Sequence, residues 1–380
     1  MLVKEIERSV QAAIADVIAR GHWQHYEGPS GELLVAQIAD RIGQSHLQLT
    51  SSGTVALEIL LRAAGIGTGD EVILSSYDYP GNFWAIERVG ARPVLVDTSV
   101  DSWRIDLESL ERAFKPSCKA IVVSHLHGEL QKVDELRAWC DHRKVFLFED
   151  ICQSLGAQWQ GSPVGSYGHA AILSFGGGKL LSCGRGGAWA TSDESLAIKA
   201  RVASGAGSGP YALSELQSAT VLAQIPWLDQ INSRCRAFFE ALDRQLKVHK
   251  CEWTFVPSSS LASTAFYQCG WQINNDGTDE VRRRLLTALH CNQPEIEGAT
   301  LTLPLGVGFP GFHRRSSRRC RIAGPLDNAI SAAVGTVVVH HRVVLQQQWK
   351  PEQLADWMAS RIAANHCAGH PANADRGLPD

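Results

Sequence analysis

The sequence of 380 residues lacks the long hydrophobic runs and the strong charge bias that mark several large classes of protein. No apolar segment approaches the ~20 residues that a membrane-spanning helix needs. The formal net charge is only −3, so no global attraction to nucleic acid or to anionic membranes is expected. The N-terminal segment MLVKEIERSV carries acids among its apolar positions and forms no signal-peptide core. We therefore expect a cytoplasmic protein that binds neither membranes nor nucleic acid.

Metal and disulfide patterns are also missing. There are ten cysteines, but they are scattered and form no C-x-x-C pair. The histidine pairs at 125/127 and 340/341 lack the i, i+4 spacing of a helical zinc site. We expect the cysteines to be reduced and mostly buried as small hydrophobic side chains, and we expect no metal site.

Two nucleotide-binding fingerprints are incomplete, the dinucleotide motif at one position and the P-loop at two. The segment GIGTGD places Asp70 where G-x-G-x-x-G requires its last glycine. A P-loop around Lys179 fails because Leu173 stands at the first glycine position and Leu180 follows the lysine. The sequence therefore predicts neither a dinucleotide fold of that type nor a P-loop.

What is present is a regular alternation of apolar strands and amphipathic helices over residues 47–150, which predicts a parallel, doubly wound α/β sheet. The chain is long enough for a second, smaller domain. We predict an N-terminal arm and a large domain over 1–245, a smaller α/β domain over 246–365, and a disordered tail over 366–380. A long helix bent at Pro226 is expected over 214–247.

The stretch 148–187 carries the most specific chemistry. An apolar strand over 145–148 runs into Glu149 and Asp150, and strands of open α/β sheets place ligands at this carboxyl end. A second apolar run over 170–175 leads into three glycines and Lys179. An amine together with a buried carboxylate suits pyridoxal 5'-phosphate (PLP): the amine forms a Schiff base and the acid holds the pyridine nitrogen protonated. Taken singly, Asp150 is equally a helix cap and Lys179 a solvated loop lysine.

Two other segments fit the same cofactor. Ser52, Gly53 and Thr54 separate a short strand from a helix, so backbone N–H groups at the helix N-terminus offer a phosphate site. The alternative is a plain Ser/Thr helix cap. Tyr77 and Tyr79 follow the next strand, where one of them can stack on a flat ring or simply pack against the fold.

In this order the motifs resemble the DegT/DnrJ/EryC1/StrS family of PLP-dependent, fold type I aminotransferases. The matching segments are SGT-x-AL at 52–57, GDEVI at 69–73, GA-x-PV-x-VD at 90–97, H-x-x-G at 125–128, ED-x-x-Q at 149–153, SF-x-x-x-K at 174–179, G-x-GG at 184–187 and SELQ-x-A at 214–219. The resemblance implies a mostly parallel sheet of the seven-stranded type.

The resemblance also implies residue roles. Lys179 would form the Schiff base and move the proton, and Asp150 would pair with the pyridine nitrogen. Gln153 would lie near the ring hydroxyl and Tyr79 would stack on the ring. The phosphate would bind Ser52, Gly53, Thr54 and Ser174.

The implied reaction takes an amino group from an amino acid, L-glutamate in the first instance, to a keto sugar that is nucleotide-linked. Alternatives are aminocyclitol (inosose) or aminohydroxybenzoate-type amination, a PLP-dependent dehydratase of the same family, and a non-enzymatic PLP-fold binding protein. The basic run 313–321 either holds an anionic substrate group or is a solvated surface.

One segment departs from the family pattern. The family's G-x-N-x-R-M run, whose Asn reaches the phosphate of the neighbouring subunit, is replaced here by SGPYAL at 208–213. A homodimer is implied by the resemblance, but both the Asn and the Arg of that run are absent.

Overall fold

The structure is a computed structural model that describes residues 2–25, 27–100, 102–205, 211–251, 253–256, 262–273, 301–302, 320–347 and 349–367. The predicted disordered tail lies outside the described residues from position 368 onward, as do residues 313–319 of the basic run.

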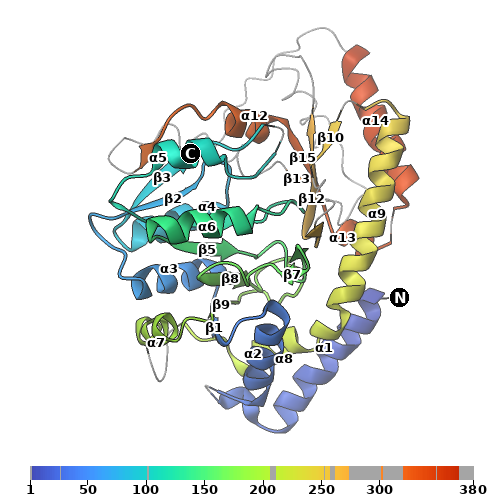
Figure 1. The fold of residues 1–380 in the computed structure, drawn as a ribbon. Helices are drawn as coiled ribbons and strands as arrows, with labels where there is room; N and C mark the ends of the chain where they lie inside the picture. Colours follow the sequence, from blue (N-terminus) through green and yellow to red (C-terminus); the bar gives the residue numbers. More distant parts are fainter. Residues whose placement is uncertain are drawn as a thin grey trace, which may run out of the picture.

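A mostly parallel sheet forms the centre of the molecule (Figure 1). Its strands, in spatial order, are β1 (His46–Thr50), β9 (Gly187–Thr191), β8 (Ala170–Ser174), β5 (Phe146–Asp150), β4 (Cys118–Ser124), β2 (Glu71–Ser75), β3 (Arg92–Val96) and β14 (Arg321–Ile322). Only β9 runs antiparallel to its neighbours within this described sheet. The parallel sheet expected from the alternation over 47–150 is confirmed, and β14 adds an eighth strand to it.

Helices cover both faces of this sheet because the buried strands alternate their side chains between two cores. Leu74 packs into the core that holds α3 (Gly53–Ala63), α4 (Pro80–Arg88) and α7 (Glu194–Ala203). Its neighbour Ile73 packs into the opposite core with α5 (Leu107–Ala113) and α6 (Val133–Arg143). With both faces covered, such a sheet binds ligands beyond the carboxyl ends of its parallel strands, which we call the carboxyl edge.

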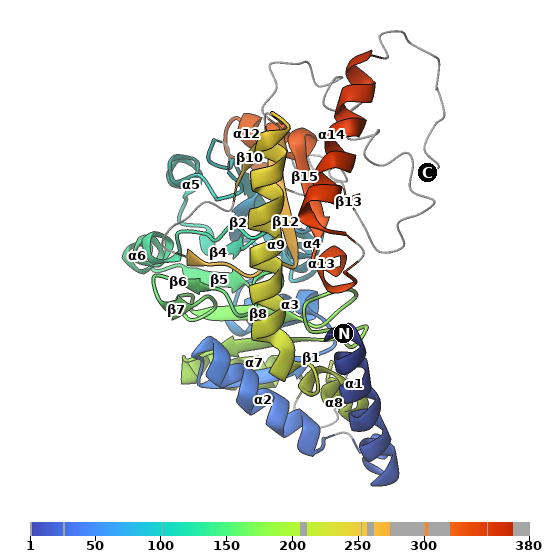
Figure 2. The same ribbon diagram turned by 90° about the vertical axis from the view of Figure 1, so that its right-hand side faces the viewer.

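A second, antiparallel sheet lies beside the first. It contains β10 (Trp253–Phe255), β12 (Gln268–Ile273), β15 (Thr336–His340) and β13 (Leu301–Thr302) in that order. A small sheet joins β11 (Ala262–Ser263), β6 (Gln158–Trp159) and β7 (Ser162–Pro163). The helices α12 (Asp327–Gly335), α13 (Arg342–Leu345) and α14 (Pro351–Cys367) complete the C-terminal part. Helix α9 (Leu228–Val248) runs along one side of the molecule from the N-terminal helices to this second sheet (Figure 2).

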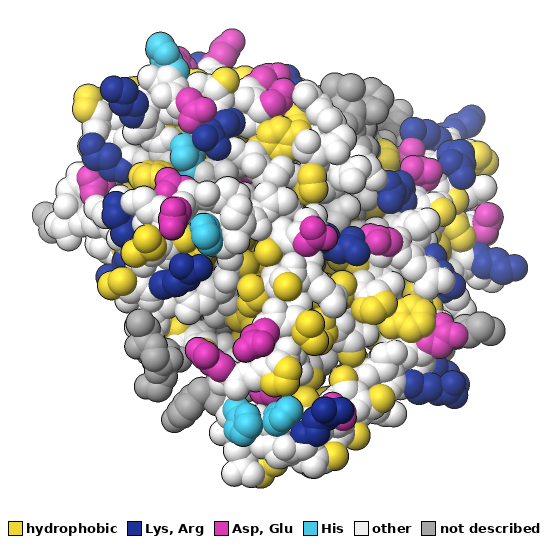
Figure 3. All heavy atoms as spheres, turned by 60° about the horizontal axis from the view of Figure 1, so that its bottom comes forward, with side chains coloured by type: hydrophobic (Ala, Val, Ile, Leu, Met, Phe, Trp, Pro, Cys, Tyr) yellow, Lys and Arg dark blue, Asp and Glu magenta, His cyan; other side chains and the backbone are white. Residues whose placement is uncertain are grey.

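The N-terminal arm consists of α1 (Leu2–Ala19), the short 3₁₀ helix η1 (His22–Gln24) and α2 (Pro29–Ile42). Both α1 and α2 pack against α8 (Glu215–Leu222). Hydrophobic and charged side chains of both signs are mixed over the lower face of the molecule (Figure 3). Among the described helices, none is both long enough and apolar enough to cross a bilayer.

The single long helix predicted over 214–247 is wrong in one respect. The chain forms α8 and α9 as separate helices, joined by a 3₁₀ turn, η2 (Ile225–Trp227). Pro226 lies in this turn, and because proline has no N–H group it breaks the helix rather than bending it.

Strand β14 is attached to the main sheet by a buried ion pair. The Arg321 guanidinium donates to both carboxylate oxygens of Glu71 at 2.8 Å, and it also donates to the Ala113 carbonyl. Glu71 is 7% exposed, and the Arg321 hydrogen bond holds the pKa of its carboxyl below the ordinary value. A segment from the C-terminal part thus closes the edge of the large sheet. The division near residue 245 stays a prediction.

We expect Arg321→Met to reduce the free energy of unfolding by about 3 kcal/mol, because Glu71 would remain buried without its counter-charge. Urea denaturation at neutral pH measures the change. The double variant Glu71→Gln/Arg321→Met should recover part of the loss. A loss below about 0.5 kcal/mol for the single variant, the level of a neutral surface change, would contradict this account.

Candidate active site

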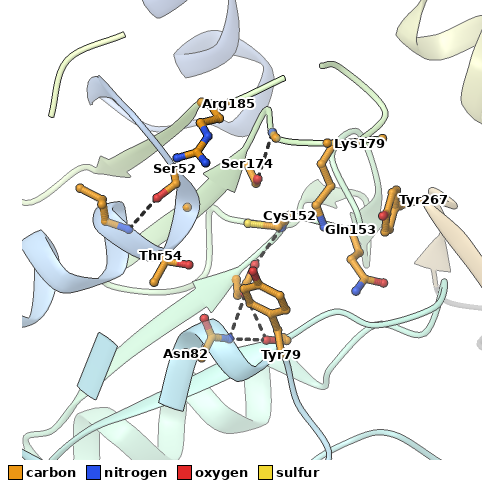
Figure 4. Close-up of a pocket in the computed structure, with 18 of the residues that line it drawn as sticks. Ser52, Thr54, Tyr79, Asn82, Cys152, Gln153, Ser174, Lys179, Arg185 and Tyr267 are labelled. Carbon is orange, nitrogen blue, oxygen red and sulfur yellow. Dashed lines mark hydrogen bonds between the residues drawn. The ribbon is translucent and has the colours of Figure 1, made fainter. Parts of the chain in front are cut away.

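A cavity of about 560 Å³ opens at the carboxyl edge of the main sheet, a size typical of small-molecule and cofactor sites. All eight residues predicted for the site line this cavity: Ser52, Gly53, Thr54, Tyr79, Asp150, Gln153, Ser174 and Lys179. They come from the ends of β1, β2, β5 and β8 and from the loops that follow (Figure 4). The structure therefore brings the predicted residues together, while their individual roles stay predictions.

The N-terminus of α3 forms one end of the cavity. The Ser52 hydroxyl caps the helix by accepting a hydrogen bond from the Val55 N–H at 3.2 Å. Gly53 and Thr54 occupy the first two helical positions, where backbone N–H groups have no intrahelical acceptor. Space beside Gly53 is tight, since a Cβ there would lie 3.1 Å from the Cys152 sulfur and from the Leu173 carbonyl oxygen. The expected Ser52 helix cap is therefore present, and the anion site at the same helix start stays a prediction.

The antiparallel strand β9 begins between the ends of β1 and β8. Gly187 pairs with Thr50 on one side and with Ser174 on the other. A Cβ on Gly187 would overlap the backbone of Ser52 and Gly53. Only glycine at 187 allows the two strand ends and the start of α3 to close on one another.

Asp150 is held at the floor of the cavity by three donors. Its Oδ1 accepts from the Cys152 N–H at 3.0 Å, and its Oδ2 accepts from Asn82 Nδ2 at 3.0 Å and lies 3.3 Å from the Ser124 hydroxyl. The side chain is 5% exposed. A carboxylate held this way keeps its orientation, which is what pairing with a ring nitrogen requires.

A second carboxyl, Asp78, shares two of these donors. Its Oδ1 lies 2.6 Å from the Ser124 hydroxyl and 3.2 Å from Asn82 Nδ2, and it accepts from the Tyr79 N–H. Its Oδ2 is buried with no hydrogen-bond partner among the described residues. Burial and the nearby negative charge of Asp150 raise the pKa of Asp78 to about 7. Asp78 therefore takes up a proton at a higher pH than an ordinary aspartate does.

Glu149, although adjacent to Asp150, has a structural role. Successive side chains of a strand point to opposite faces, so Glu149 points away from the cavity. Its carboxylate accepts from the N–H groups of Gly165 and Gly168 and contacts His125 Nε2 at 3.3 Å. The side chain thereby holds the 165–168 loop against the sheet.

Lys179 follows the glycines 176–178, and its side chain points into the cavity (Figure 4). Its Nζ lies 4.1 Å from the centre of the Tyr267 ring, an arrangement typical of a cation–π contact. Tyr267 comes from the loop before β12, so the amine lies between the two sheets. The Tyr267 N–H in turn donates to the Gln153 carbonyl, which links the tyrosine to the strand β5 side of the cavity.

Gln153 and Tyr79 occupy the sides of the cavity. The Gln153 Oε1 accepts from the His127 N–H at 3.2 Å, and its side-chain N–H₂ group lies at the cavity wall. Tyr79 is the residue before α4 and remains 41% exposed. Gly81 allows the Tyr79 ring and Thr54 to approach, because a Cβ at 81 would overlap both side chains.

The SELQ segment at the start of α8 supports the cavity from outside. Ser214 and Gln217 form a capping box, and Gln217 Nε2 also donates to the Arg185 carbonyl at 2.8 Å. The Glu215 carboxylate accepts from the N–H groups of Ser30 and Gly31 at the start of α2. One helix start therefore anchors both the N-terminal arm and the loop before β9.

Several residues of the site were not predicted from the sequence. Ser124 ends β4 and Asn82 lies in the first turn of the helix after β2, so their positions at the carboxyl edge of the sheet were a usable signal. Tyr267 had none, since no motif surrounds it. Arg185 was hidden at the variable position of G-x-GG. Each of these side chains lines the cavity.

The remaining predictions concern the basic run, the cysteines and a metal site. Of the basic run, Arg321 is committed to Glu71, and residues 313–319 are outside the described part of the chain. The eight described cysteines are all free, as expected. Within the described residues, no cluster of His, Cys, Asp and Glu has the arrangement of a metal site.

The raised pKa of Asp78 predicts a stability that depends on pH. Between the ordinary pKa near 4 and about 7, the folded chain holds a proton that the unfolded chain has lost, so stability falls as pH rises through this window. Asp78→Asn removes this group. We expect the melting temperature of the wild type to drop relative to Asp78→Asn by a few degrees between pH 5 and pH 8. The exposed-site control Glu7→Gln should track the wild type, and a constant difference between Asp78→Asn and the wild type would contradict the prediction.

Comparison with known proteins identifies the family. The model of the DegT/DnrJ/EryC1/StrS aminotransferase family matches residues 4–301. The erythromycin biosynthesis sensory transduction protein EryC1 of Saccharopolyspora erythraea is 35% identical, covering 64% of this chain and 69% of that protein. The L-glutamine:2-deoxy-scyllo-inosose aminotransferase of Micromonospora echinospora is 30% identical, covering 93% of this chain and 92% of its own. A dTDP-3-amino-3,4,6-trideoxy-alpha-D-glucose transaminase of Streptomyces venezuelae is 34% identical, covering 61% of this chain and 63% of that protein.

Solved structures agree on the fold. The crystal structure of 3-amino-5-hydroxybenzoic acid synthase superposes with a TM-score of 0.81 at 24% identity, covering 94% of this chain and 97% of that one. The fold type I architecture expected from the resemblance is thus confirmed. With a family model that spans most of its length, the chain belongs to the DegT/DnrJ/EryC1/StrS aminotransferase family, whose members are PLP-dependent transaminases.

Proposed function

We propose that this aminotransferase holds PLP in the cavity at the carboxyl edge, attached to Lys179, and moves an amino group from an amino acid to a keto sugar. The observation that carries the proposal is the placement of one amine and one fixed, buried carboxylate in the same cavity, with a helix N-terminus at its end. The donor set fits the coenzyme: an acceptor for a ring N–H, an amine for the aldehyde, and free backbone N–H groups for a phosphate.

The bound coenzyme supplies an electron sink, which weakens the bonds at the carbon that carries the amino group. The chain supplies position and proton transfer. Asp150, fixed by Asn82, Ser124 and the Cys152 N–H, would hold the proton on the ring nitrogen. Lys179 Nζ would move the proton between the α-carbon of the donor and C4′ of the coenzyme.

The other predicted residues orient the coenzyme. Gly53 and Thr54 offer backbone N–H groups, and Ser52 and Ser174 offer hydroxyls, for the phosphate. Gln153 would lie near the ring hydroxyl, and the Tyr79 ring would stack on the coenzyme. Stacking has room because Tyr79 is only partly covered.

For the amino acceptor we propose a nucleotide-linked keto sugar, with a cyclitol ketone as the second candidate. The family relative named as a dTDP-amino-sugar transaminase favours the first. The inosose aminotransferase, which matches over nearly the full length of both chains, favours the second. We propose L-glutamate as the amino donor, and the name of the same relative makes L-glutamine the donor to compare with it.

We expect purified protein to carry PLP, to release the keto acid from L-glutamate or L-glutamine, and then to aminate one class of keto acceptor. Lys179→Ala should abolish both half-reactions, because it removes the amine and the proton carrier. Keto-acid release measured enzymatically, with acceptor amination followed by mass spectrometry, provides the test. The exposed-lysine variant Lys199→Ala should keep its activity.

Borohydride reduction gives an independent readout, since it should fix the coenzyme covalently to the peptide that contains Lys179. Full activity of Lys179→Ala, or a reduced adduct on a different lysine, would overturn the assignment. Protein that takes up no PLP would overturn the proposal as a whole.

We also propose that the enzyme is a cytoplasmic homodimer, with the mouth of the cavity at the subunit contact. Three large aromatic side chains are 39–45% exposed: Tyr79, which lines the cavity, Trp84 on the helix α4 that follows it, and Tyr211, whose carbonyl accepts from the N–H of the lining residue Ser51. Aromatic residues are enriched at subunit interfaces. The free cysteines fit a reducing compartment.

Light scattering after size-exclusion chromatography should give the mass of two chains. Trp84→Glu should shift the protein toward one chain, because it would place a charge in the contact. A wild-type protein that elutes as a single chain at assay concentration would contradict the dimer.

A further inference from the structure

The structure points to one cation whose partner is missing, Arg185. Three cationic side chains of Lys and Arg appear in the described lining of the cavity. Lys179 lies against Tyr267, and Arg88 lies 3.9 Å from the carboxylate of Glu58. Within the described part of the chain, the Arg185 guanidinium has neither a carboxylate nor a hydrogen-bond acceptor. Arginine side chains beside a helix N-terminus suit anionic, bidentate ligands.

The backbone of Arg185 is fixed more firmly than an ordinary loop. Its carbonyl accepts from Gln217 Nε2 at 2.8 Å and lies 3.1 Å from the Cys183 sulfur. The flanking glycines pair back onto the chain: the Phe175 N–H donates to the Gly186 carbonyl at 2.8 Å, and the Gly177 N–H donates to the Gly184 carbonyl at 3.0 Å. The side chain is thus free while its Cα is held.

The register of the sheet places Arg185 close to the N-terminus of α3. Gly187, two residues after Arg185, pairs with both Thr50 and Ser174. Figure 4 shows the Arg185 side chain beside Ser52, on the same side of the cavity as Ser174. Gly176, opposite Arg185 in the paired loop, has no side chain to fill the space between them.

The donors already described at this end of the cavity are all neutral. They are the N–H groups of Gly53 and Thr54 and the hydroxyls of Ser52 and Ser174. A phosphate monoester carries a charge of about −1.5 to −2 at neutral pH. A neutral site would have to desolvate that charge without a counter-ion, which is costly. One arginine beside the helix N-terminus would provide that counter-ion.

We propose that Arg185 is the cationic phosphate-binding residue of this chain, and that its ligand is the phosphate group of the coenzyme. The inference rests on the proposed function. It gives the phosphate a contact within one subunit, where the segment 208–213 lacks the Asn that reaches the neighbouring subunit's phosphate in the family pattern. The diphosphate of a nucleotide-linked substrate shares this chemistry, so the experiment must separate the two sources.

The test is the affinity of the full-length protein, freed of coenzyme, for PLP and for pyridoxal, which lacks the phosphate. Absorbance titration measures both. Arg185→Gln should raise the Kd for PLP about tenfold, as expected for loss of a charge-assisted contact, and leave the Kd for pyridoxal unchanged. The Kd of Arg185→Lys for PLP should lie between the values of the wild type and Arg185→Gln. Added salt should weaken PLP binding more in the wild type than in Arg185→Gln.

Arg62→Gln is the control, since it removes an exposed arginine charge from helix α3 at a residue that pairs with Glu58 and does not line the cavity. It should change the Kd for PLP by less than about threefold, the scale of an exposed ion pair. Because Arg185 is exposed, equal melting temperatures of the coenzyme-free proteins should show that the fold is intact.

Three results would overturn the inference. The first is an unchanged Kd for PLP in Arg185→Gln, and the second is an equal loss for PLP and pyridoxal. The third is unchanged PLP binding with weaker binding of a nucleotide-linked sugar, which would give Arg185 to the substrate. In each case wild-type PLP binding leaves the proposed function standing. Failure of the wild type to bind PLP would instead remove both.

Discussion

The arrangement of this site depends on one close contact, the passage of Gly187 against the backbone of Ser52 and Gly53. Through it, the antiparallel strand β9 enters between β1 and β8 at the carboxyl edge of an otherwise parallel sheet. The contact brings the start of α3 and the loop before β9 to the same point. A ligand that meets one of these elements therefore meets the other.

The same edge explains why chemically different side chains converge. Asp150 ends β5 and Ser124 ends β4, while Asn82 lies in the first turn of the helix after β2. Because parallel strands all present their carboxyl ends at one edge, a short hydrogen-bond network can join residues that lie 26 to 68 positions apart. That network also holds a second carboxyl, Asp78, whose pKa burial and the nearby Asp150 raise to about 7.

Much of this was visible in the sequence. Apolar strands that end in Asp150 and in the glycines before Lys179 predicted the sheet edge and the cavity, and every predicted site residue lies there. Periodicity was less informative where backbone chemistry decides, as at Pro226, whose missing N–H group divides the predicted helix in two. Contacts between distant segments left no local trace: Tyr267 approaches Lys179 only through the pairing of the second sheet, and Arg321 reaches Glu71 across 250 positions.

The start of α8 links the N-terminal arm to the loop before β9. Glu215 fastens α2, while Gln217, half a turn later, fastens the carbonyl of Arg185. These two attachments belong to one rigid turn of helix, so a displacement of the arm is transmitted to the rim of the cavity without passing through the sheet. A displacement of α2, for example on assembly with another chain, would therefore reach the loop before β9 at the Arg185 carbonyl.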